Sequence, residues 1–271
     1  MRSLIFGAAL ALATPFLTSA DVLNDWTDGI ATFYGGEPDR MDPHAPSYGT
    51  KEGSCGFFNL SKDVYPFWQV GAFATSNKFF NSLPGKACGT CWEVECVEGK
   101  QFAGRCRPGA KPVTITITDS CPECAADHLD LQALVFDKIA PASGGRIDVR
   151  YRRVSCQPPS SMNMNVQSNY GPDAWLRLVV GGTAGKGAMK NVQIKGPDGV
   201  WTDMENRWGN AWEVSKAPAL PWDFKFVAED GQAVEAKSLV GASGQVGDLP
   251  TGVQFSLSGK QGSAAPVDGG K

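Results

Sequence analysis

Two aspartates and a histidine are the residues of this sequence best suited, by type and position, to acid–base chemistry. Asp119 follows an alternating segment that predicts a strand over residues 113–118, and His128 and Asp130 precede a helical pattern that begins at residue 131. Inverting glycoside hydrolysis needs a protonated carboxylic acid and, about 6.5–9.5 Å away, an ionised carboxylate that activates a water. Asp130 could be the acid, but the spacing leaves open whether any residue is the base.

Each of these residues also has a purely structural interpretation. Asp119 opens a Pro-containing segment and could begin an Asx-type turn. Asp130 stands where an N-cap of the following helix would stand, and His128 could be a surface residue of a loop. The sequence has no Gly-x-Ser-x-Gly, P-loop or His-Glu-x-x-His motif, and two histidines are too few for a His-rich metal site. We therefore expect no metal and no other cofactor.

Composition narrows the class of protein. The 271 residues are 42% hydrophobic, enough to form cores, and 32 glycines and 18 prolines favour many turns and short strands over long helices. The 25 basic and 28 acidic residues give a net charge of −3 without a basic stripe, so nucleic acid is not an expected partner.

The N-terminal segment has the pattern of a secretory signal peptide. Arg2 supplies positive charge, an apolar stretch runs over residues 4–16, and small residues end the segment at Ala20. A membrane anchor is the alternative, but the stretch is too short to span a bilayer and contains Pro15. We expect a secreted, extracellular protein that begins near Asp21 and has no membrane partner after cleavage.

Export decides how the cysteines are interpreted. All eight lie in one stretch, at Cys55, Cys88, Cys91, Cys96, Cys106, Cys121, Cys124 and Cys156. An even number of cysteines in an oxidising compartment predicts disulfides. Two C-x-x-C motifs make zinc the alternative, but 29 residues separate them, more than the usual spacing of about 15–20. Zinc-binding thiolates would also have to escape oxidation outside the cell.

The cysteines end at a Pro- and Ser-rich segment that predicts a boundary between two all-β domains. Before it, alternating segments and one amphipathic helix over residues 131–140 favour a closed β-barrel. After it, the alternating segments Leu176–Val180, Trp222–Phe226 and Val253–Leu257 favour a β-sandwich. We expect a signal peptide over residues 1–20, a barrel over 21–157, a linker over 158–167, a sandwich over 168–258 and a loose tail over 259–271.

The tryptophans divide by the parity of their neighbours. Core positions are expected for Trp92, Trp201, Trp212 and Trp222. Trp175 instead points away from the apolar face of its strand, and Trp208 lies in a polar, turn-forming segment. Exposed indoles stack well on the C–H faces of sugar rings, so this pair predicts carbohydrate binding. The alternative is that both rings cover gaps beneath loops.

Ordered motifs run along nearly the whole chain after the signal segment. They are Ala31–Gly36, Ser54–Leu60, Cys88–Val94, Thr116–Asp119, His128–Leu131, Tyr151–Cys156, Ile194–Gly196, Gly199–Trp201 and Arg207–Trp212. In order and spacing they resemble the plant expansins. The resemblance implies a six-stranded double-psi β-barrel related to family-45 glycoside hydrolases, followed by an immunoglobulin-like, cellulose-binding sandwich. It also implies cell-wall loosening through noncovalent contacts between cellulose and matrix glycans.

The resemblance further implies which residues form the site. The groove of the barrel would be lined by Thr32, Tyr34, Asp119 and Asp130, with His128 beside it. Trp175 and Trp208 fall on positions where the family displays sugar-stacking aromatics. The implied disulfides are Cys55–Cys88, Cys91–Cys156 and Cys96–Cys106, which leaves the extra Cys121 and Cys124 to pair with each other. The implied partner is cellulose, hemicellulose or another matrix glycan, bound by a monomer in the cell wall.

Departures from the family pattern bear on the chemistry. Leu129 occupies the middle of the motif usually written His-Phe-Asp, and Gly35-Gly36 stands where the related hydrolases keep a catalytic base. Residues that could replace this base are Glu37, Asp39, Asp42 and Glu52. Because an acid alone cannot activate water, we expect loosening without hydrolysis. The alternatives are an endoglucanase with Asp130 as general acid and a carbohydrate-binding protein without loosening activity.

Overall fold

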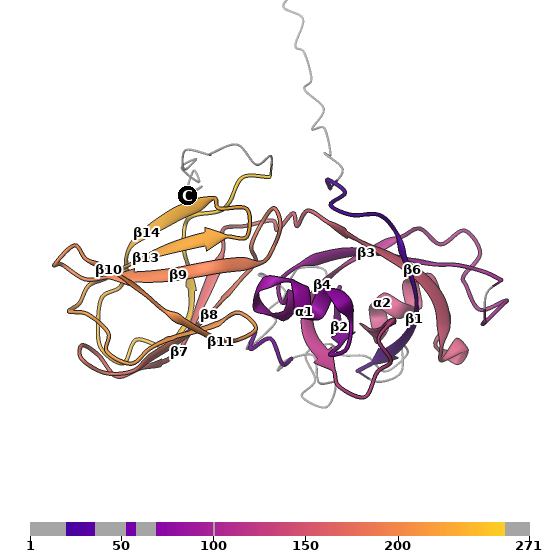
Figure 1. Cartoon of the computed structure of the whole chain (residues 1–271), viewed down its shortest axis with the longest axis horizontal. Helices are drawn as coiled ribbons and strands as arrows, with labels where there is room; N and C mark the ends of the chain where they lie inside the picture. The colour runs from indigo at the N-terminus through magenta and orange to yellow at the C-terminus, as the bar shows by residue number, and fades with distance from the viewer. Residues whose placement is uncertain (1–19, 36–52, 58–68, 100, 258–271) are drawn as a thin grey trace, which may run out of the picture.

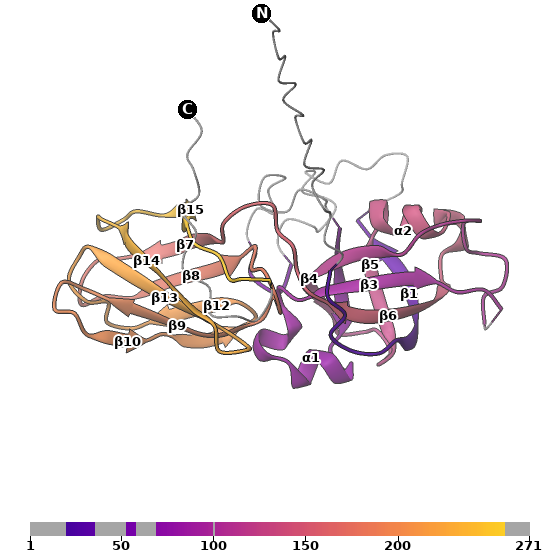
Figure 2. The ribbon, with the colours of Figure 1, turned by 90° about the horizontal axis from the view of Figure 1, so that it is seen from above.

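The computed structural model describes residues 20–35, 53–57, 69–99 and 101–257. The two units lie side by side along the long axis of an elongated molecule (Figure 1), and a view from above shows the same arrangement (Figure 2). The predicted signal peptide and tail lie outside the described residues, except Ala20, and so do the four carboxylates that could replace the catalytic base.

The first unit is a closed barrel with the strand order β1-β5-β2-β4-β3-β6. Its strands are β1 (Thr27–Tyr34), β2 (Val70–Ala74), β3 (Cys91–Cys96), β4 (Val113–Cys121), β5 (His128–Gln132) and β6 (Ile147–Val154). The pairs β1–β5 and β2–β4 are parallel, and the other pairs are antiparallel. Phe73, Trp92 and Tyr151 are fully buried and pack together in its core, with Phe73 and Trp92 ring centroids 4.9 Å apart.

Among the described residues, four short helical segments accompany the barrel: α1 (Lys78–Ser82), η3 (Pro84–Ala87), α2 (Ala133–Ile139) and η4 (Ala142–Gly144). Helix α2 buries Val135, Phe136 and Ile139 and begins two residues later than the pattern predicts. Gln132 is its N-cap, and its Oε1 accepts a hydrogen bond from the backbone of residue 134 at 2.9 Å. The interpretation of Asp130 as an N-cap is therefore wrong, because this residue lies in β5.

The second unit is a sandwich of a four-stranded sheet, β10-β9-β13-β14, and a five-stranded sheet, β11-β12-β8-β7-β15. Its strands are β7 (Asn163–Asn169), β8 (Leu176–Gly181), β9 (Met189–Lys195), β10 (Trp201–Asp203), β11 (Glu205–Trp208), β12 (Ala211–Val214), β13 (Trp222–Ala228), β14 (Ala233–Val240) and β15 (Gly247–Pro250). Because β7 begins at Asn163, the second half of the predicted linker belongs to the sandwich. The strand predicted over Val253–Leu257 is absent, and β15 lies earlier in the chain.

The core of the sandwich contains the aromatic residues that parity assigned to it. Trp212 and Trp222 are buried, as are Phe224 and Phe226, so these predictions are confirmed, like that for Trp92 in the barrel. Trp201 is the exception. Its indole is only partly buried and lies over the ammonium groups of two lysines on the outer face of the four-stranded sheet.

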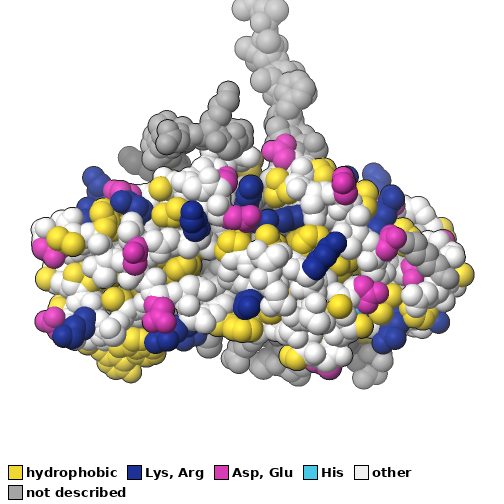
Figure 3. All heavy atoms as spheres, viewed as in Figure 1, with side chains coloured by type: hydrophobic (Ala, Val, Ile, Leu, Met, Phe, Trp, Pro, Cys, Tyr) yellow, Lys and Arg dark blue, Asp and Glu magenta, His cyan; other side chains and the backbone are white. Residues whose placement is uncertain are grey.

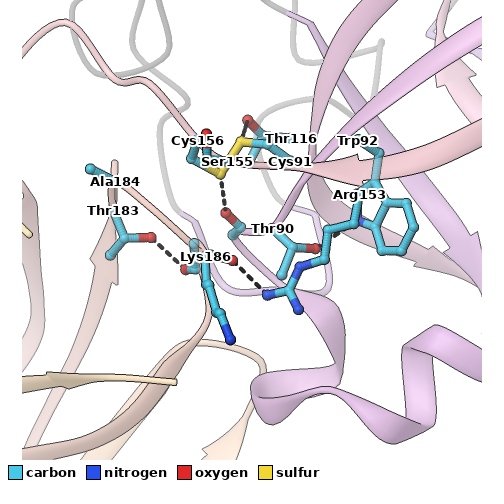
Figure 4. The surroundings of a disulfide bond; sticks show 12 residues. Thr90, Cys91, Trp92, Thr116, Arg153, Ser155, Cys156, Thr183, Ala184 and Lys186 are labelled. Atoms are coloured by element: carbon cyan, nitrogen blue, oxygen red, sulfur yellow. Dashed lines mark hydrogen bonds between the residues drawn. A yellow bond between two sulfur atoms is a disulfide. The ribbon is translucent and has the colours of Figure 1, made fainter. Parts of the chain in front are cut away.

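The structure contains four disulfides, and they are the pairs that the resemblance implied. They join Cys55–Cys88, Cys91–Cys156, Cys96–Cys106 and Cys121–Cys124. The Cys91–Cys156 bond attaches the start of β3 to the segment that leaves the barrel after β6 (Figure 4). The last of the eight cysteines is Cys156, so all four bonds stabilise the barrel and its exit.

The junction between the two units is packed and partly buried. Arg153 of β6 pairs with Glu229 at 2.5 Å and donates to the carbonyl oxygen of Lys186 at 2.6 Å, close to the Cys91–Cys156 disulfide (Figure 4). Val179 and Ala211 of the sandwich belong to the same apolar cluster as the barrel core. The units therefore meet through an apolar contact as well as an ion pair.

Charged side chains of both signs alternate on the face of the molecule shown in Figure 3, without a large area of one sign. None of the helices among the described residues is long and apolar enough to cross a membrane. Those residues also contain no group of three or more His, Cys, Asp or Glu side chains that could hold a metal ion.

Candidate functional site

A chain of hydrogen bonds on the barrel joins three of the residues expected in the groove. Parallel pairing of β1 and β5 sets Thr32 opposite Asp130, two residues along from His128. The Thr32 hydroxyl donates to Asp130 Oδ1 at 2.6 Å and lies 2.8 Å from His128 Nε2. Because the one hydroxyl proton of Thr32 points to Asp130, His128 Nε2 is the donor in the other bond. His128 is buried in β5 and is not the exposed loop residue that the sequence suggested.

The surroundings of these hydrogen-bonded residues change the pKa values of Asp130 and His128. Burial raises the pKa of Asp130, and the negative charges of Glu123 and Asp119 add to the effect, while the hydrogen bond from Thr32 opposes it. Burial lowers the pKa of His128, and the nearby charge of Arg146 lowers it further. These shifts favour the neutral form of both groups. In that form the Asp130 carboxyl group can donate a hydrogen bond to a hydroxyl oxygen, whereas the single N–H of His128 is already donated to Thr32.

Tyr34 stands at the end of β1 and shares this environment. Burial raises the pKa of its phenol, and the charges of Asp119 and Asp130 raise it further. Its hydrogen bond with the Thr118 side chain acts in the opposite direction. The phenol consequently remains protonated and keeps its O–H group as a donor.

Asp119 is held by backbone groups. It lies within β4, which runs to Cys121 and is longer than the strand predicted over residues 113–118. Its Oδ1 accepts the backbone N–H groups of Ser54 at 2.7 Å and Ser120 at 2.8 Å. These bonds attach the segment 53–57 to β4, so Asp119 fixes that segment in addition to contributing its charge.

Trp175 and Trp208 lie on the outer face of the five-stranded sheet. Trp175 directly precedes β8, and alternation gives its side chain the same direction as Arg177 and Val179. Val179 pairs with Ala211 of β12, and Ala211 pairs with Trp208 of β11, so Trp208 lies on the same face. Trp175 is 37% exposed, as parity predicted, and Trp208 is 42% exposed, as its polar, turn-forming segment predicted. Two indoles thus present area to solvent on one face of the sandwich.

Neighbouring aromatics distinguish the two exposed indoles. Tyr170, 70% exposed, stacks on Trp175 with centroids 6.1 Å apart and planes at 23°. Trp208 instead lies 6.1 Å from Phe80 of α1, on the barrel side of the junction. A side chain at Gly209 would come 2.8 Å from the carbonyl oxygen of Cys55, so only glycine allows this close approach. Trp208 is therefore placed where the sandwich meets the barrel.

A polar network runs beneath these indoles toward the barrel. Glu213 of β12 accepts hydrogen bonds from Arg177 at 2.6 Å and from Arg207 at 3.0 Å. Arg177 donates to Gln167 at 2.7 Å, and Gln167 donates to the carbonyl oxygen of Gly56 at 3.1 Å. Gly56 belongs to the segment 53–57 that Asp119 holds, so the network extends from the sheet face to that segment.

Two members of this surface were not identified from the sequence. Tyr170 follows β7 in a turn, and no periodicity marks it as exposed. Parity correctly gives Glu213 an outward direction, opposite to Trp212, but its partners come from β8 and β11 and are visible only in the folded sheet.

The strand order of the closed barrel and the sandwich packed against it define a two-domain protein with a double-psi barrel. Two family models match the chain, one described as lytic transglycolase over residues 72–151 and one as the expansin C-terminal domain over residues 162–240. Expansin-A22 of Arabidopsis thaliana is 31% identical over 241 residues, which cover 82% of this chain and 79% of that protein. The chain belongs to the expansin family and is an expansin-like cell wall protein.

Further relatives agree with this assignment. Expansin-A10 of Oryza sativa subsp. japonica is 29% identical over 265 residues, covering 91% of this chain and 95% of that protein. Among solved structures, the apo crystal structure of Clavibacter michiganensis expansin has a TM-score of 0.60 at 21% identity, covering 82% of this chain and 95% of that one. A mutant of the same bacterial expansin in complex with cellohexaose also gives a TM-score of 0.60, at 20% identity and the same coverage. The two structures share the fold of this chain.

Proposed function

We propose that this protein is secreted and, as a monomer, binds cellulose or a matrix glycan and loosens the cell wall without hydrolysis. The groove supplies Thr32, Tyr34, Asp119, Asp130 and His128, and the sandwich supplies Trp175 and Trp208. One observation carries the proposal: the Gln167–Gly56 hydrogen bond of 3.1 Å joins the sheet face beneath the indoles to the segment at the groove edge. A glucan chain lying over the junction would contact both domains.

The two halves of this surface offer complementary contacts to a polysaccharide. The exposed indoles present flat faces for the C–H groups of sugar rings. The Tyr34 phenol can donate a hydrogen bond to a sugar hydroxyl, and so can Asp130 in the protonated form that its raised pKa favours. A surface that binds a separated chain more tightly than a packed one shifts the local equilibrium toward separation, and no covalent bond needs to break. The solved complex of the bacterial expansin with cellohexaose supports a glucan as the class of ligand.

Hydrolysis by Asp130 as general acid is the second candidate function. The raised pKa of Asp130 favours it, because a general acid must be protonated at the working pH. It also requires an ionised carboxylate on the other side of the sugar. A binding protein without loosening activity is the third candidate, favoured by the exposed indoles alone.

Extension of isolated, heat-inactivated walls under constant load tests the proposal. We expect the purified protein to increase extension without releasing reducing ends, and Asp130→Asn to abolish the extension. Asp137→Asn is the matched control, because Asp137 is an aspartate of the same domain that pairs with Arg107 at the surface. Release of reducing ends that is lost in Asp130→Asn would establish the endoglucanase. Retention on cellulose without extension would establish the binding protein.

A further inference from the structure

Tyr170 is a large aromatic side chain that is exposed on the sheet face carrying Trp175. It directly follows β7, and Trp175 directly precedes β8. Asn169 pairs with Leu176, so Tyr170 and Trp175 are the next cross-strand pair and share one face of the sheet. The backbone N–H of Tyr170 donates to the carbonyl oxygen of Trp175 at 3.3 Å, which continues the ladder to this pair. Because Tyr170 is 70% exposed, it contributes little to the core of the sandwich.

The turn that carries Tyr170 is fixed, although the phenol itself is exposed. The buried side chain of Asn169 donates to two carbonyl oxygens of the segment 242–245, at 3.0 and 3.2 Å. Its Oδ1 accepts the backbone N–H of Gly171 at 3.0 Å. A Cβ at Gly171 would lie 2.4 Å from Ser243 Oγ, so glycine allows the turn to pack against this segment. The backbone position of Tyr170 is therefore set before any ligand binds.

The rings of Tyr170 and Trp175 are nearly parallel, and both remain accessible. Their centroids are 6.1 Å apart and their planes differ by 23°. Trp175 keeps 37% of its surface exposed beside Tyr170, so neither ring covers the other. Aromatic faces with this spacing and orientation can contact neighbouring sugar units of one chain.

Trp208 lies too far away to belong to this pair. Four residues along the strand separate Trp175 from Val179, and two strand spacings separate Val179 from Trp208, so the Cα atoms of the two tryptophans are about 16 Å apart. Tyr170 lies on the opposite side of Trp175, because the strands follow the order β11-β12-β8-β7. The sheet face thus has two adjacent rings remote from the barrel and a single indole near the junction.

We propose that Tyr170 and Trp175 form a two-ring subsite for adjacent sugar units of a glucan chain, in which Tyr170 contacts the sugar directly. This inference rests on the proposed function, because it assumes that the sandwich binds a glucan. The ring of Tyr170 supplies an apolar face, and its hydroxyl group can exchange hydrogen bonds with sugar hydroxyls. A side chain on a fixed turn loses less conformational freedom on binding than one on a mobile loop. A short glucan can occupy this subsite without reaching Trp208.

Titrations with cellotriose and cellohexaose, followed by nuclear magnetic resonance of the amide groups of the full chain, test this subsite. Tyr170→Ala should raise the Kd of cellotriose about 3- to 10-fold, the range for one aromatic contact, and Trp175→Ala by at least as much. Tyr170→Phe, which keeps the ring, should retain most of the affinity. Trp208→Ala should weaken the binding of cellohexaose but not that of cellotriose. The control Trp201→Ala, on the opposite sheet, should leave both Kd values as in the wild type.

A second comparison separates direct contact from mere support of the neighbouring indole. In the Trp175→Ala background, Tyr170→Ala should still weaken the binding of cellohexaose about 2-fold or more. The absence of a further loss would show that Tyr170 only supports Trp175 and would overturn the proposal. An unchanged cellotriose Kd in a folded Tyr170→Ala protein, or an equal loss in Trp208→Ala, would also overturn it. If the wild type binds neither oligosaccharide, the proposed function itself fails, whereas binding that does not depend on Tyr170 contradicts this inference alone.

Discussion

The barrel and the sandwich hold their candidate site residues by different physical means. In the barrel, Asp130 lies on a strand, hydrogen-bonded to Thr32 in a partly buried chain, and its pKa is raised. In the sandwich, Glu213 lies on an outer sheet face between two arginines, and its pKa is lowered. The surroundings of a carboxyl group thus favour its protonated form in the barrel and its ionised form in the sandwich. The raised pKa favours a hydrogen-bond donor where sugar hydroxyls would bind, and the lowered pKa favours an acceptor between two arginines.

The two domains also differ in what stabilises them. The barrel and its exit contain all eight cysteines of the chain, whereas the sequence after Cys156 contains none. The sandwich relies on a packed core that includes Trp222, Phe224 and Phe226, all fully buried. The groove depends on connections between strands distant in the sequence, while the sheet face follows from regular antiparallel pairing. Cross-links are therefore concentrated where regular pairing contributes less.

Removing disulfides should produce the largest difference between the domains. Because chain-entropy stabilisation grows with loop length, Cys91→Ser/Cys156→Ser, at a separation of 65 residues, should cost about 4 kcal/mol of barrel stability. Cys121→Ser/Cys124→Ser, at a separation of 3 residues, should cost roughly 2 kcal/mol. Guanidinium unfolding followed by tryptophan fluorescence measures both losses. Equal losses in the two double mutants would contradict the dependence on loop length.

Replacing single tryptophans should separate binding from stability within the sandwich. Trp175→Ala should weaken retention on cellulose by about 10-fold or more, the loss expected for an aromatic hot spot, while the unfolding midpoint changes little. Trp201→Ala is the control, because Trp201 lies on the outer face of the other sheet. If Trp201→Ala lost as much binding as Trp175→Ala, the glucan could not be assigned to the five-stranded sheet, and the prediction would be contradicted.

The opposite tuning of the two carboxyl groups predicts opposite dependences of stability on pH. Because the pKa of Asp130 is raised in the folded state, the protein loses folding stability as the pH rises from the ordinary aspartate pKa through the folded-state pKa. Asp130→Asn should therefore gain stability relative to wild type as the pH rises. The lowered pKa of Glu213 gives a stabilisation that is lost as the pH falls through its folded-state pKa.

Glu213→Gln should accordingly be less stable than wild type at neutral pH and equal to it in acid. Both differences in unfolding free energy should be about 1 kcal/mol at their largest, the centre of the range for single substitutions. Unfolding free energies measured from acid to neutral pH for both variants check the signs. Two differences that change with pH in the same direction would show that the contrast between the domains is absent.

Regular alternation was sufficient to predict the direction of many side chains. The strand that follows Trp175 has a continuous apolar face, so the outward direction of Trp175 follows from local sequence alone. The same reasoning wrongly predicted a core position for Trp201, because β10 has only three residues, too few to show an apolar face. The ring lies against the ammonium groups of Lys195 and Lys225 on the outer face, and not in the core that the sequence pattern indicated.

The groove could not be derived from periodicity. Strand β5 is buried at four of its five positions, so it lacks alternation and merges with the helical pattern that follows. The bond that orients Asp130 comes from Thr32, 98 residues earlier, through a parallel pairing that local sequence does not encode. Only the resemblance to expansins brought these residues together before the structure did. The Arg177–Glu213–Arg207 cluster required sheet register for the same reason.

The smallest predicted effect concerns the link between the two regions. Gln167→Ala removes the hydrogen bond to the Gly56 carbonyl oxygen and the bond accepted from Arg177, but it replaces no indole and no expected groove residue. Retention of long cellulose chains should fall about 2-fold, at the lower end of the net contribution of one hydrogen bond, whereas the affinity for short cello-oligosaccharides that reach only the indoles should not change. Asn165→Ala is the control, because Asn165 is an amide of the same strand that bonds Asp248 within the sandwich. If Gln167→Ala weakens short and long ligands equally, the residue belongs to the indole surface and not to the connection with the barrel.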